Sequence, residues 1–243
     1  MGAGPGDPGL ITLRGVERLR EADLVVHDRL INEELLQYAP CAGRIDVGKL
    51  PDHHPIPQNE INAILVGQAL AGRKVVRLKG GDPFLFGRGG EEAQALAAAG
   101  IPFEIVPGVT SAIAVPAYAG IPVTQRGLAN SVAFITGHSA GSRPLDLDWK
   151  SLAHGVDTLV FLMGVSSLPE IIHSLAHAGL SGKTPVALIE RGTLPSQMVI
   201  TGDLSDILDK AAAVESPCII VVGRVVDLHP VLHWFQAQPE VAG

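Results

Sequence analysis

The sequence has few cysteines, a low content of charged residues and no long apolar run. Cys41 and Cys218 are its only cysteines, and they lie far apart without a CxxC pattern, which excludes a disulfide framework and favours a reducing compartment. Charged residues make up 18% of the chain and hydrophobic residues 47%, a balance that excludes a disordered or fibrous protein. No window approaches the roughly 18 consecutive apolar residues of a membrane span, and no secretory leader is evident. We therefore expect a cytoplasmic protein.

Basic residues are also scarce, since 18 Lys and Arg stand against 25 Asp and Glu, for a net charge of −7. This balance argues against a nucleic-acid-binding module, whose surface would be basic. One local basic cluster, relieved within its own interval only by Asp82, is compatible with an acidic small molecule as substrate. The members of this cluster are Arg73, Lys74, Arg77, Lys79 and Arg88.

What the sequence does contain is an alternation of short apolar runs with segments of helical periodicity. In the helical segments apolar residues recur near every 3.6 positions, as at Leu168, Ile171, Ile172 and Leu175. This alternation predicts an α/β fold with mainly parallel strands, covered by helices on both faces of the sheet. The predicted strands span residues 24–27, 75–78, 103–106, 132–136, 158–162, 186–189 and 218–222.

Glycine and proline mark a boundary near the middle of the chain. The 243 residues are enough for one large domain or two small ones. Gly120, Pro122 and Gly127 interrupt the helical and apolar patterns and predict a hinge in this region. We therefore expect two α/β domains, over residues 1–118 and 131–243, joined by a linker over residues 119–130.

Two patterns typical of other enzyme classes are present but incomplete. Residues 43–49 resemble a phosphate-binding P-loop, but Leu50 replaces the hydroxyl residue and Pro51 follows where a helix should begin. Residues 137–141 match the GxSxG nucleophile elbow of serine hydrolases around Ser139, yet loop residues follow where that fold requires a helix. A hydrolase at Ser139 is therefore an alternative of another class, and it predicts covalent labelling of that serine by a fluorophosphonate.

Histidines do not form a convincing metal site. His173 and His177 lie one turn apart on a predicted helix, but no third zinc ligand accompanies them. A solvated helix face is the favoured interpretation of this pair. His53 and His54 lie in a proline-rich loop, where exposure or contact with a substrate is favoured over metal binding. We expect no metal.

Glycine-rich loops carry the strongest functional signal. Residues 79–92 contain five glycines and Asp82, and they follow one predicted strand and lead into a helix. Residues 107–112 follow the next predicted strand, and residues 2–9 open the chain with four glycines. Ligands of α/β sheets bind beyond the carboxyl ends of the strands, and glycines allow a ligand to approach the backbone closely. These loops predict a cleft for a small molecule.

Together these residues resemble the uroporphyrinogen-III C-methyltransferases, within the tetrapyrrole methylase superfamily of S-adenosylmethionine-dependent enzymes. The resemblance covers essentially the whole chain, and the block over residues 79–92 is its most specific part. It also includes GAGPGDPGLITL at the start, VHDRL at 26–30, VGK at 47–49, VPGVTSA at 106–112, YAGIP at 118–122, TGH at 136–138 and Met163-Gly164.

The resemblance implies two α/β domains in the tetrapyrrole methylase fold, with the S-adenosylmethionine cleft between them, in a homodimer. It implies that two methyl groups are transferred to uroporphyrinogen III, giving precorrin-2 for sirohaem or cobalamin synthesis and leaving S-adenosylhomocysteine. The N-terminal domain would carry the substrate and cofactor loops, and the C-terminal domain would complete the cofactor site. The implied cofactor contacts are Pro5, Gly80, Gly81, Asp82, Leu85, Thr110, Ser111, Met163 and Gly192.

The resemblance also assigns roles to ionisable residues. Asp28 matches the proposed proton acceptor and Lys49 the proposed donor. A sulfonium methyl group is already activated, so the protein has mainly to align the reactants and manage one proton, through Asp28 or Glu91. Arg88 would orient the macrocycle. Because arginine forks suit carboxylates, the candidate anchors for the eight carboxylates of the substrate are Arg29, Lys49, Arg88 and Arg126.

The sequence departs from the family pattern at a few positions. Leu162 stands where a tyrosine is common, Gln125 where a histidine is usual and Arg191 where an asparagine often precedes Gly192. Met1 directly precedes the opening glycines, where family members have a short apolar strand. The alternatives within the superfamily are methylases of a later precorrin, of diphthamide or of ribosomal RNA, and a binding protein without activity is a further alternative.

Overall fold

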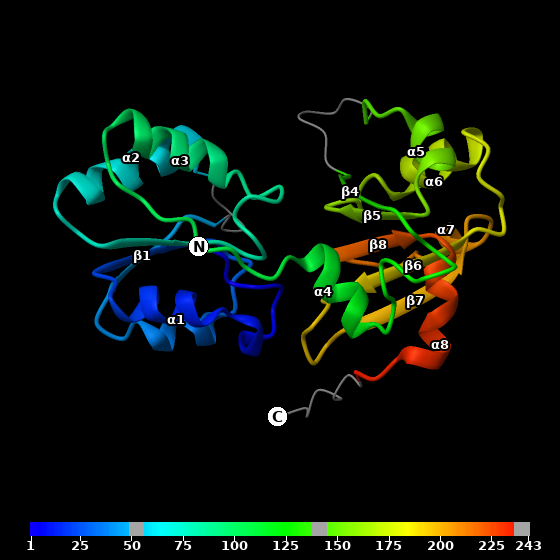
Figure 1. Cartoon of the computed structure of the whole chain (residues 1–243), viewed down its shortest axis with the longest axis horizontal. Coiled ribbons are helices and arrows are strands. Elements are labelled where there is room, and N and C mark those ends of the chain that lie inside the picture. Colours follow the sequence, from blue (N-terminus) through cyan, green and yellow to red (C-terminus); the bar gives the residue numbers. More distant parts are fainter. Residues whose placement is uncertain (49–55, 138–144, 236–243) are drawn as a thin grey trace. The chain divides into compact units, whose positions relative to one another are not determined.

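The computed structural model describes residues 1–48, 56–137 and 145–235 (Figure 1). Contacts divide the chain into two compact units, Met1–Thr110 and Ser111–Gly243. The expected linker over residues 119–130 falls inside the second unit. The assignment of substrate and cofactor roles to the two halves stays a prediction.

The first unit is built on a three-stranded parallel sheet in the order β2-β1-β3. β1 (Leu24–His27) and β3 (Val75–Leu78) have the predicted bounds, and β2 (Gly43–Asp46) adds an edge. Helices α2 (Gln58–Leu70) and α3 (Gly89–Ala98) lie on one side of this sheet and α1 (Leu13–Arg20) on the other (Figure 1). Short 3-10 helices span Pro8–Leu10 and Glu33–Tyr38. Helices on both faces explain why Leu24, Val25 and Val26 of β1 are all apolar and buried.

The second unit contains a five-stranded mixed sheet in the order β4-β5-β8-β6-β7. Only β4 and β5 are parallel, and the other neighbouring pairs are antiparallel. The expectation of mainly parallel strands is therefore correct for the first unit and wrong for the second. The short connection between β6 and β7 explains part of this difference, because a parallel crossover needs a dozen or more residues. The strands are β4 (Val132–Thr136), β5 (Thr158–Leu162), β6 (Pro185–Glu190), β7 (Met198–Asp203) and β8 (Cys218–Val222).

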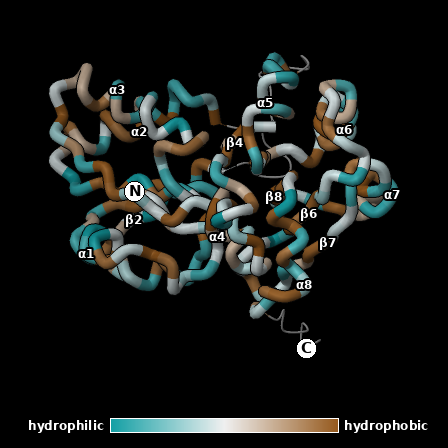
Figure 2. Tube along the Cα trace, turned by 45° about the vertical axis from the view of Figure 1, so that its right-hand side comes forward, coloured by the Kyte–Doolittle hydropathy of each residue, from teal (hydrophilic) through white to brown (hydrophobic). Residues whose placement is uncertain are grey.

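The core of the second unit lies under α6. Every residue of β5 and β8 is buried. Figure 2 shows hydrophobic residues of the second unit in brown, for example at α6. Ile171, Ile172 and Leu175 of α6 pack in one cluster with Phe161 of β5, which is fully buried. The helices are α4 (Ser111–Tyr118), α5 (Trp149–Gly155), α6 (Leu168–His177), α7 (Ile207–Lys210) and α8 (His229–Leu232), with a 3-10 helix at Arg224–Leu228. The spacing of apolar residues at 168–175 predicted this buried face.

The sequence analysis missed two edge strands, β2 and β7, in which no residue is buried. β2 was considered only as part of a P-loop pattern, and three of its four residues are exposed. β7 is partly exposed along its whole length and carries Gly202 and Asp203 at its end. Because these two strands bury little apolar surface, their sequences lack the continuous apolar run that marked the predicted strands.

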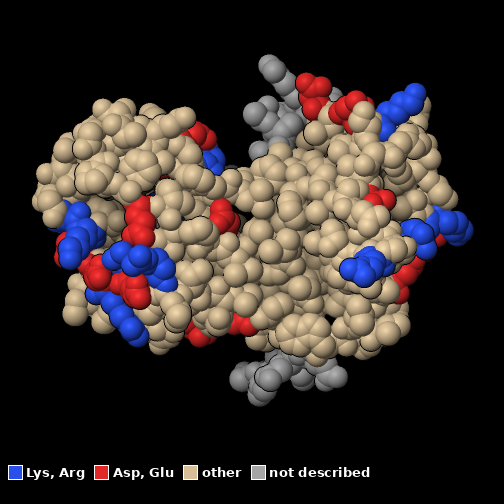
Figure 3. Space-filling model, viewed as in Figure 1, with Lys and Arg blue, Asp and Glu red and all other residues tan. Residues whose placement is uncertain are grey.

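Residues 103–106, in contrast, form no strand although they were predicted to form one. Gly2 N–H donates to Val106 O (3.0 Å), but no continuous ladder follows in the described residues. Glu104 lies at the surface, where its carboxylate accepts from Arg18 Nε (2.6 Å) of α1. Figure 3 shows charged side chains gathered over this part of the molecule. The ion pairs there join Arg14, Glu17, Arg18, Glu21 and Glu104.

Within the part of the chain that the structure describes, no helix combines the length and the apolarity needed to cross a membrane.

The two thiols differ in their environment, which leads to a first prediction. Burial raises the pKa of the Cys218 thiol to about 12, whereas Cys41 is exposed. At pH 8 Cys218 is therefore protonated and inaccessible, so we expect the folded protein to react with one equivalent of a disulfide reagent and the unfolded protein with two. Cys41→Ser should remove the folded-state reaction. Two rapidly reacting thiols in the folded protein would contradict the burial of Cys218.

Candidate functional site

The chain start lies alongside the glycine-rich loop that follows β3. Ala3 N–H donates to Lys79 O (2.7 Å), and Gly2 pairs with Lys79 in parallel. Gly2 N–H also donates to Val106 O, so the chain start also contacts the segment directly before the third loop, which begins at residue 107. The structure therefore brings together, within the first unit, the glycine-bearing loops that the sequence analysis singled out. They cover residues 2–9, 79–92 and 107–110.

These loops approach one another so closely that side chains do not fit between them. A Cβ atom on Gly108 would lie 2.3 Å from Gly81 O and 2.7 Å from Gly2 Cα. A Cβ atom on Gly2 would lie 2.5 Å from Gly108 Cα. Gly81 has a φ of 64°, in the left-handed region that favours glycine. The glycines are thus required by backbone-to-backbone packing at this edge of the first unit.

Asp82 fastens two of the loops to each other. Its Oδ1 accepts from Phe84 N–H (2.8 Å), and its Oδ2 accepts from Gly108 N–H (3.0 Å). The sequence analysis named Asp82 as an implied cofactor contact, and in the structure both of its carboxylate oxygens accept from backbone N–H groups of the loops. The neighbouring candidate cofactor contacts Pro5, Gly80, Gly81 and Leu85 are all half-buried.

Arg88 and Glu91 form an exposed pair at the start of α3. Arg88 has a φ of 58°, and its guanidinium donates to both carboxylate oxygens of Glu91, each at 2.8 Å. This hydrogen bonding lowers the pKa of Glu91 and raises that of Arg88. A carboxylate with a lowered pKa is a weaker base, so this pairing weakens Glu91 as a candidate proton acceptor.

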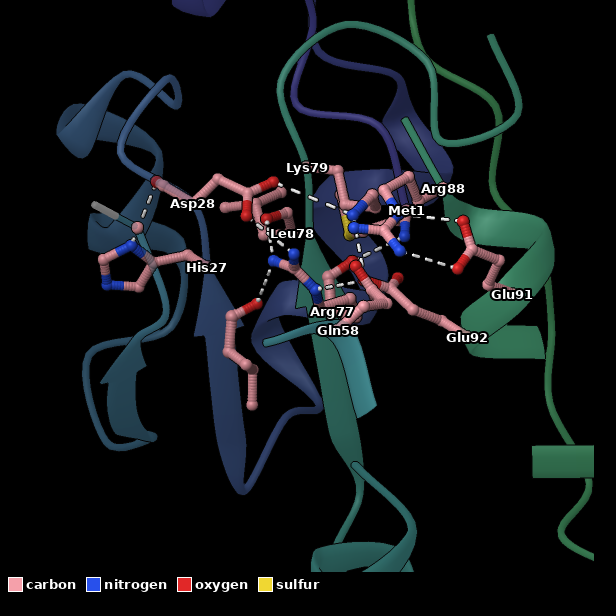
Figure 4. A network of polar contacts seen from close by, with 12 residues as sticks. Met1, His27, Asp28, Gln58, Arg77, Leu78, Lys79, Arg88, Glu91 and Glu92 are labelled. Atoms are coloured by element: carbon pink, nitrogen blue, oxygen red, sulfur yellow. Dashed lines mark hydrogen bonds and ion pairs between the residues drawn. The ribbon is translucent and has the colours of Figure 1, made fainter. Parts of the chain in front are cut away.

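Asp28 directly follows β1 and belongs to a group of largely buried ionisable side chains, shown in Figure 4. Its Oδ1 accepts from Arg77 Nη2 (2.6 Å), and Lys79 Nζ lies 3.8 Å from its Oδ2. Glu92, from the first turn of α3, binds the same two cations at 3.1 and 2.9 Å. We refer to Asp28, Arg77, Lys79 and Glu92 as the buried ionic cluster.

The sequence analysis missed the role of this cluster. Arg77 and Lys79 were grouped with surface cations for an acidic substrate, with Asp82 as the only nearby acid. The structure instead neutralises both with Asp28 and Glu92, and the side chains of both are at most 10% exposed. The spacing of Arg77 and Lys79 was a signal, because residues two positions apart along a strand point to the same face of the sheet. Arg73 and Lys74, the two residues that directly precede β3, are exposed.

In the second unit the candidate residues follow the ends of β5 and β6. Met163 has a φ of 56° and is half exposed, and Arg191 and Thr193 have φ values of 48° and 69° on either side of Gly192. Left-handed non-glycine residues are uncommon and cluster at functional sites. Gly192 itself is buried, and a Cβ atom there would lie 2.3 Å from Val115 Cγ1 of α4.

This contact leads to a prediction for the second unit. We expect Gly192→Ala to destabilise the protein by about 1–3 kcal/mol, because the added methyl overlaps Val115. Combining it with Val115→Ala should cost less than the sum of the two single changes, since the second change removes the overlapping methyl groups. Urea unfolding of the four proteins measures this coupling. Gly155→Ala is the matched control, because a Cβ atom there meets nothing within 4 Å. Additive effects would contradict the predicted overlap.

The remaining candidates are dispersed or undescribed. Arg29 directly follows Asp28 and is exposed, and Arg126 is exposed in the second unit. Thr110 ends the first unit and Ser111 begins α4. Among the described residues no group of three His, Cys, Asp or Glu could hold a metal ion, and His173 and His177 are exposed. Lys49, Ser139, His53 and His54 lie outside the described residues.

Comparison with known proteins gives a consistent result. The Tetrapyrrole (Corrin/Porphyrin) Methylases match residues 1–208. The uroporphyrinogen-III C-methyltransferase of Priestia megaterium is 52% identical over 230 residues, which are 93% of this chain and 97% of that one. Siroheme synthase 3 of Aeromonas hydrophila is 52% identical over 97% of this chain, but the match covers 50% of that protein. The chain thus spans about half the length of the siroheme synthases it matches.

Solved structures agree with these relatives. The crystal structure of the uroporphyrin-III C-methyltransferase from Thermus thermophilus, complexed with S-adenosylhomocysteine, has a TM-score of 0.81 and 38% identity. The alignment covers 94% of this chain and 97% of that one. The comparisons do not favour a serine hydrolase or a methylase of diphthamide or ribosomal RNA. Sequence and fold together show that this chain belongs to the tetrapyrrole methylase family.

Proposed function

We propose that this chain transfers two methyl groups from S-adenosylmethionine to carbons of uroporphyrinogen III, forming precorrin-2. The observation that carries this proposal is the match to the Priestia megaterium enzyme, because it extends over nearly the full length of both chains. Siroheme synthases match over half of their length, so precorrin-2 formation for sirohaem is the proposed pathway step. Supply of cobalamin synthesis, a homodimeric state and a cytoplasmic location are proposed on the family resemblance.

The described residues fit S-adenosylmethionine. The half-buried Gly80 and Gly81 carry no side chain, so a ligand can reach their backbone N–H and C=O groups. In the second unit the exposed thioether of Met163 and the loop around Gly192 offer further contacts. When bound, the cofactor supplies a methyl group activated on a sulfonium. The proposed contacts are Pro5, Gly80, Gly81, Asp82, Leu85 and Thr110 in the first unit, and Ser111, Met163 and Gly192 in the second.

The residues of this chain would then bind the substrate and manage its proton. Asp28 is proposed to accept the proton that leaves the macrocycle, because its carboxylate is partly exposed and is held by Arg77. Lys49 is the proposed donor. Arginine forks bind carboxylates in a bidentate manner, so Arg29, Arg88 and Arg126, together with Lys49, are the proposed anchors. Arg88 already binds Glu91, and a substrate carboxylate would have to compete with that pair.

The proposal is tested by anaerobic incubation of the protein with uroporphyrinogen III and methyl-labelled S-adenosylmethionine. Mass spectrometry of the macrocycle should show two added methyl groups. Binding of S-adenosylhomocysteine, measured by calorimetry, provides a readout that does not depend on the substrate. No transfer with intact binding would overturn the proposed substrate and leave a methylase for another one. No transfer and no binding would overturn the proposed activity.

A further inference from the structure

The buried ionic cluster in the first unit calls for an explanation beyond stability. The side chains of Arg77, Lys79 and Glu92 are 10%, 6% and 5% exposed. Removing charges from water is costly, and a buried ion network is often no more stabilising than apolar residues of the same size. The cluster combines two basic side chains with two acidic ones. The contacts of each member therefore have to be considered for a role in the site.

Arg77 is held rigidly on the side away from Asp28. Its Nε donates to Glu92 Oε1 (3.1 Å), and its Nη1 lies within hydrogen-bond distance of Val26 O (3.4 Å) and Leu78 O (3.2 Å). Glu92 Oε1 also accepts from Lys79 Nζ (2.9 Å) and Gln58 Nε2 (3.2 Å). The partners of Arg77 come from β1, β3 and α3, and Gln58 of α2 in turn holds Glu92. These contacts from several elements fix the orientation of the guanidinium plane.

Asp28 is the open end of this arrangement. Its side chain is 29% exposed, several times more than those of the other three members. Arg77 Nη2 donates to its Oδ1 at 2.6 Å, while Lys79 Nζ approaches Oδ2 only to 3.8 Å, beyond hydrogen-bond distance. One carboxylate oxygen is therefore bound by a charge-assisted hydrogen bond, whereas no described residue lies within hydrogen-bond distance of the other, which can meet a proton or a substrate group. Figure 4 shows both oxygens and their neighbours.

We infer that Arg77 is a positioning residue for Asp28, and that it fixes the carboxylate so that Oδ2 is presented for proton transfer. The inference rests on the proposed function, in which Asp28 accepts a proton from the substrate. Glu92 is the counter-charge that keeps Arg77 in place. A group held in one orientation loses no reorganisation energy when it reacts, which is why a positioning residue raises kcat.

The test is a double-mutant cycle with Arg77→Met and Asp28→Asn in the full chain. If Arg77 acts through Asp28, Arg77→Met should lower kcat about tenfold or more in the wild-type background and have little further effect beside Asp28→Asn. The KM for uroporphyrinogen III and the affinity for S-adenosylhomocysteine should change by less than about threefold. Arg77→Lys, which keeps the charge but not the fork, should recover part of the loss.

A matched control and a second readout keep the outcomes distinct. Arg224→Met removes an exposed arginine from the second unit, one with no proposed binding role, and should leave kcat unchanged. The same cycle followed by urea unfolding measures the coupling of Arg77 to Asp28 without turnover, and we expect about a tenfold effect on the unfolding constant. A wild-type chain that does not methylate uroporphyrinogen III would overturn the proposed function alone. Multiplicative effects on kcat, or no coupling in unfolding, would overturn the positioning role.

Discussion

Asp28→Asn is expected to lower kcat for uroporphyrinogen III by about 10²- to 10³-fold, within the range usual for loss of a general base. The asparagine side chain has the same shape, and its carbonyl oxygen can still accept from Arg77 Nη2, as Oδ1 of Asp28 does at 2.6 Å. It is neither negatively charged nor basic, so it cannot take the proton. The expected loss is therefore one of chemistry rather than of folding. Steady-state methylation followed by mass spectrometry measures it.

Two measurements show whether this loss has the expected cause. S-adenosylhomocysteine should bind Asp28→Asn with nearly wild-type affinity, because no proposed cofactor contact is changed. Asp209→Asn makes the same chemical change at an exposed position of the second unit and should retain wild-type kcat. If Asp28→Asn keeps more than about a third of the wild-type kcat, Asp28 is not the proton acceptor, and Glu91 becomes the next candidate despite its lowered pKa.

Gly108→Ala is expected to have the largest effect on stability and cofactor binding together. The added methyl group would lie 2.3 Å from Gly81 O and 2.7 Å from Gly2 Cα, and both neighbours are backbone atoms. Backbone atoms cannot rotate away as a side chain can, so the loops must separate. We expect a loss of about 3 kcal/mol in the free energy of unfolding, and at least about a tenfold loss of affinity for S-adenosylhomocysteine. Urea unfolding and calorimetry measure the two effects.

Gly67→Ala is the matched control for this change. Gly67 lies in α2, and a Cβ atom there meets nothing within 4 Å. Alanine is the better helix former by about 0.5–1 kcal/mol, so this variant should be as stable as the wild type or slightly more stable. Wild-type stability and wild-type affinity in Gly108→Ala would together show that the loops do not pack backbone against backbone.

Local sequence patterns predicted the elements that bury the most apolar surface. β1, β3, β4, β5 and β8 have the bounds that their apolar runs indicated, and the buried face of α6 follows the spacing of its apolar residues. The edge strands β2 and β7 were missed, and residues 103–106 were wrongly predicted as a strand. Hydrophobic periodicity reports burial, whereas strand pairing also depends on which segments lie beside each other.

The sequence by itself determined the family, the α/β class and the position of the glycine loops, because these depend on residue types in fixed local spacings. Only the tertiary structure decided that Gly2, Gly81 and Gly108 meet backbone to backbone. It also decided that Arg77, which looked like a surface cation, is buried against Asp28, 49 residues away in the chain. The orientation of the Asp28 carboxylate depends on that long-range contact, and no local pattern records which distant residues a fold brings together.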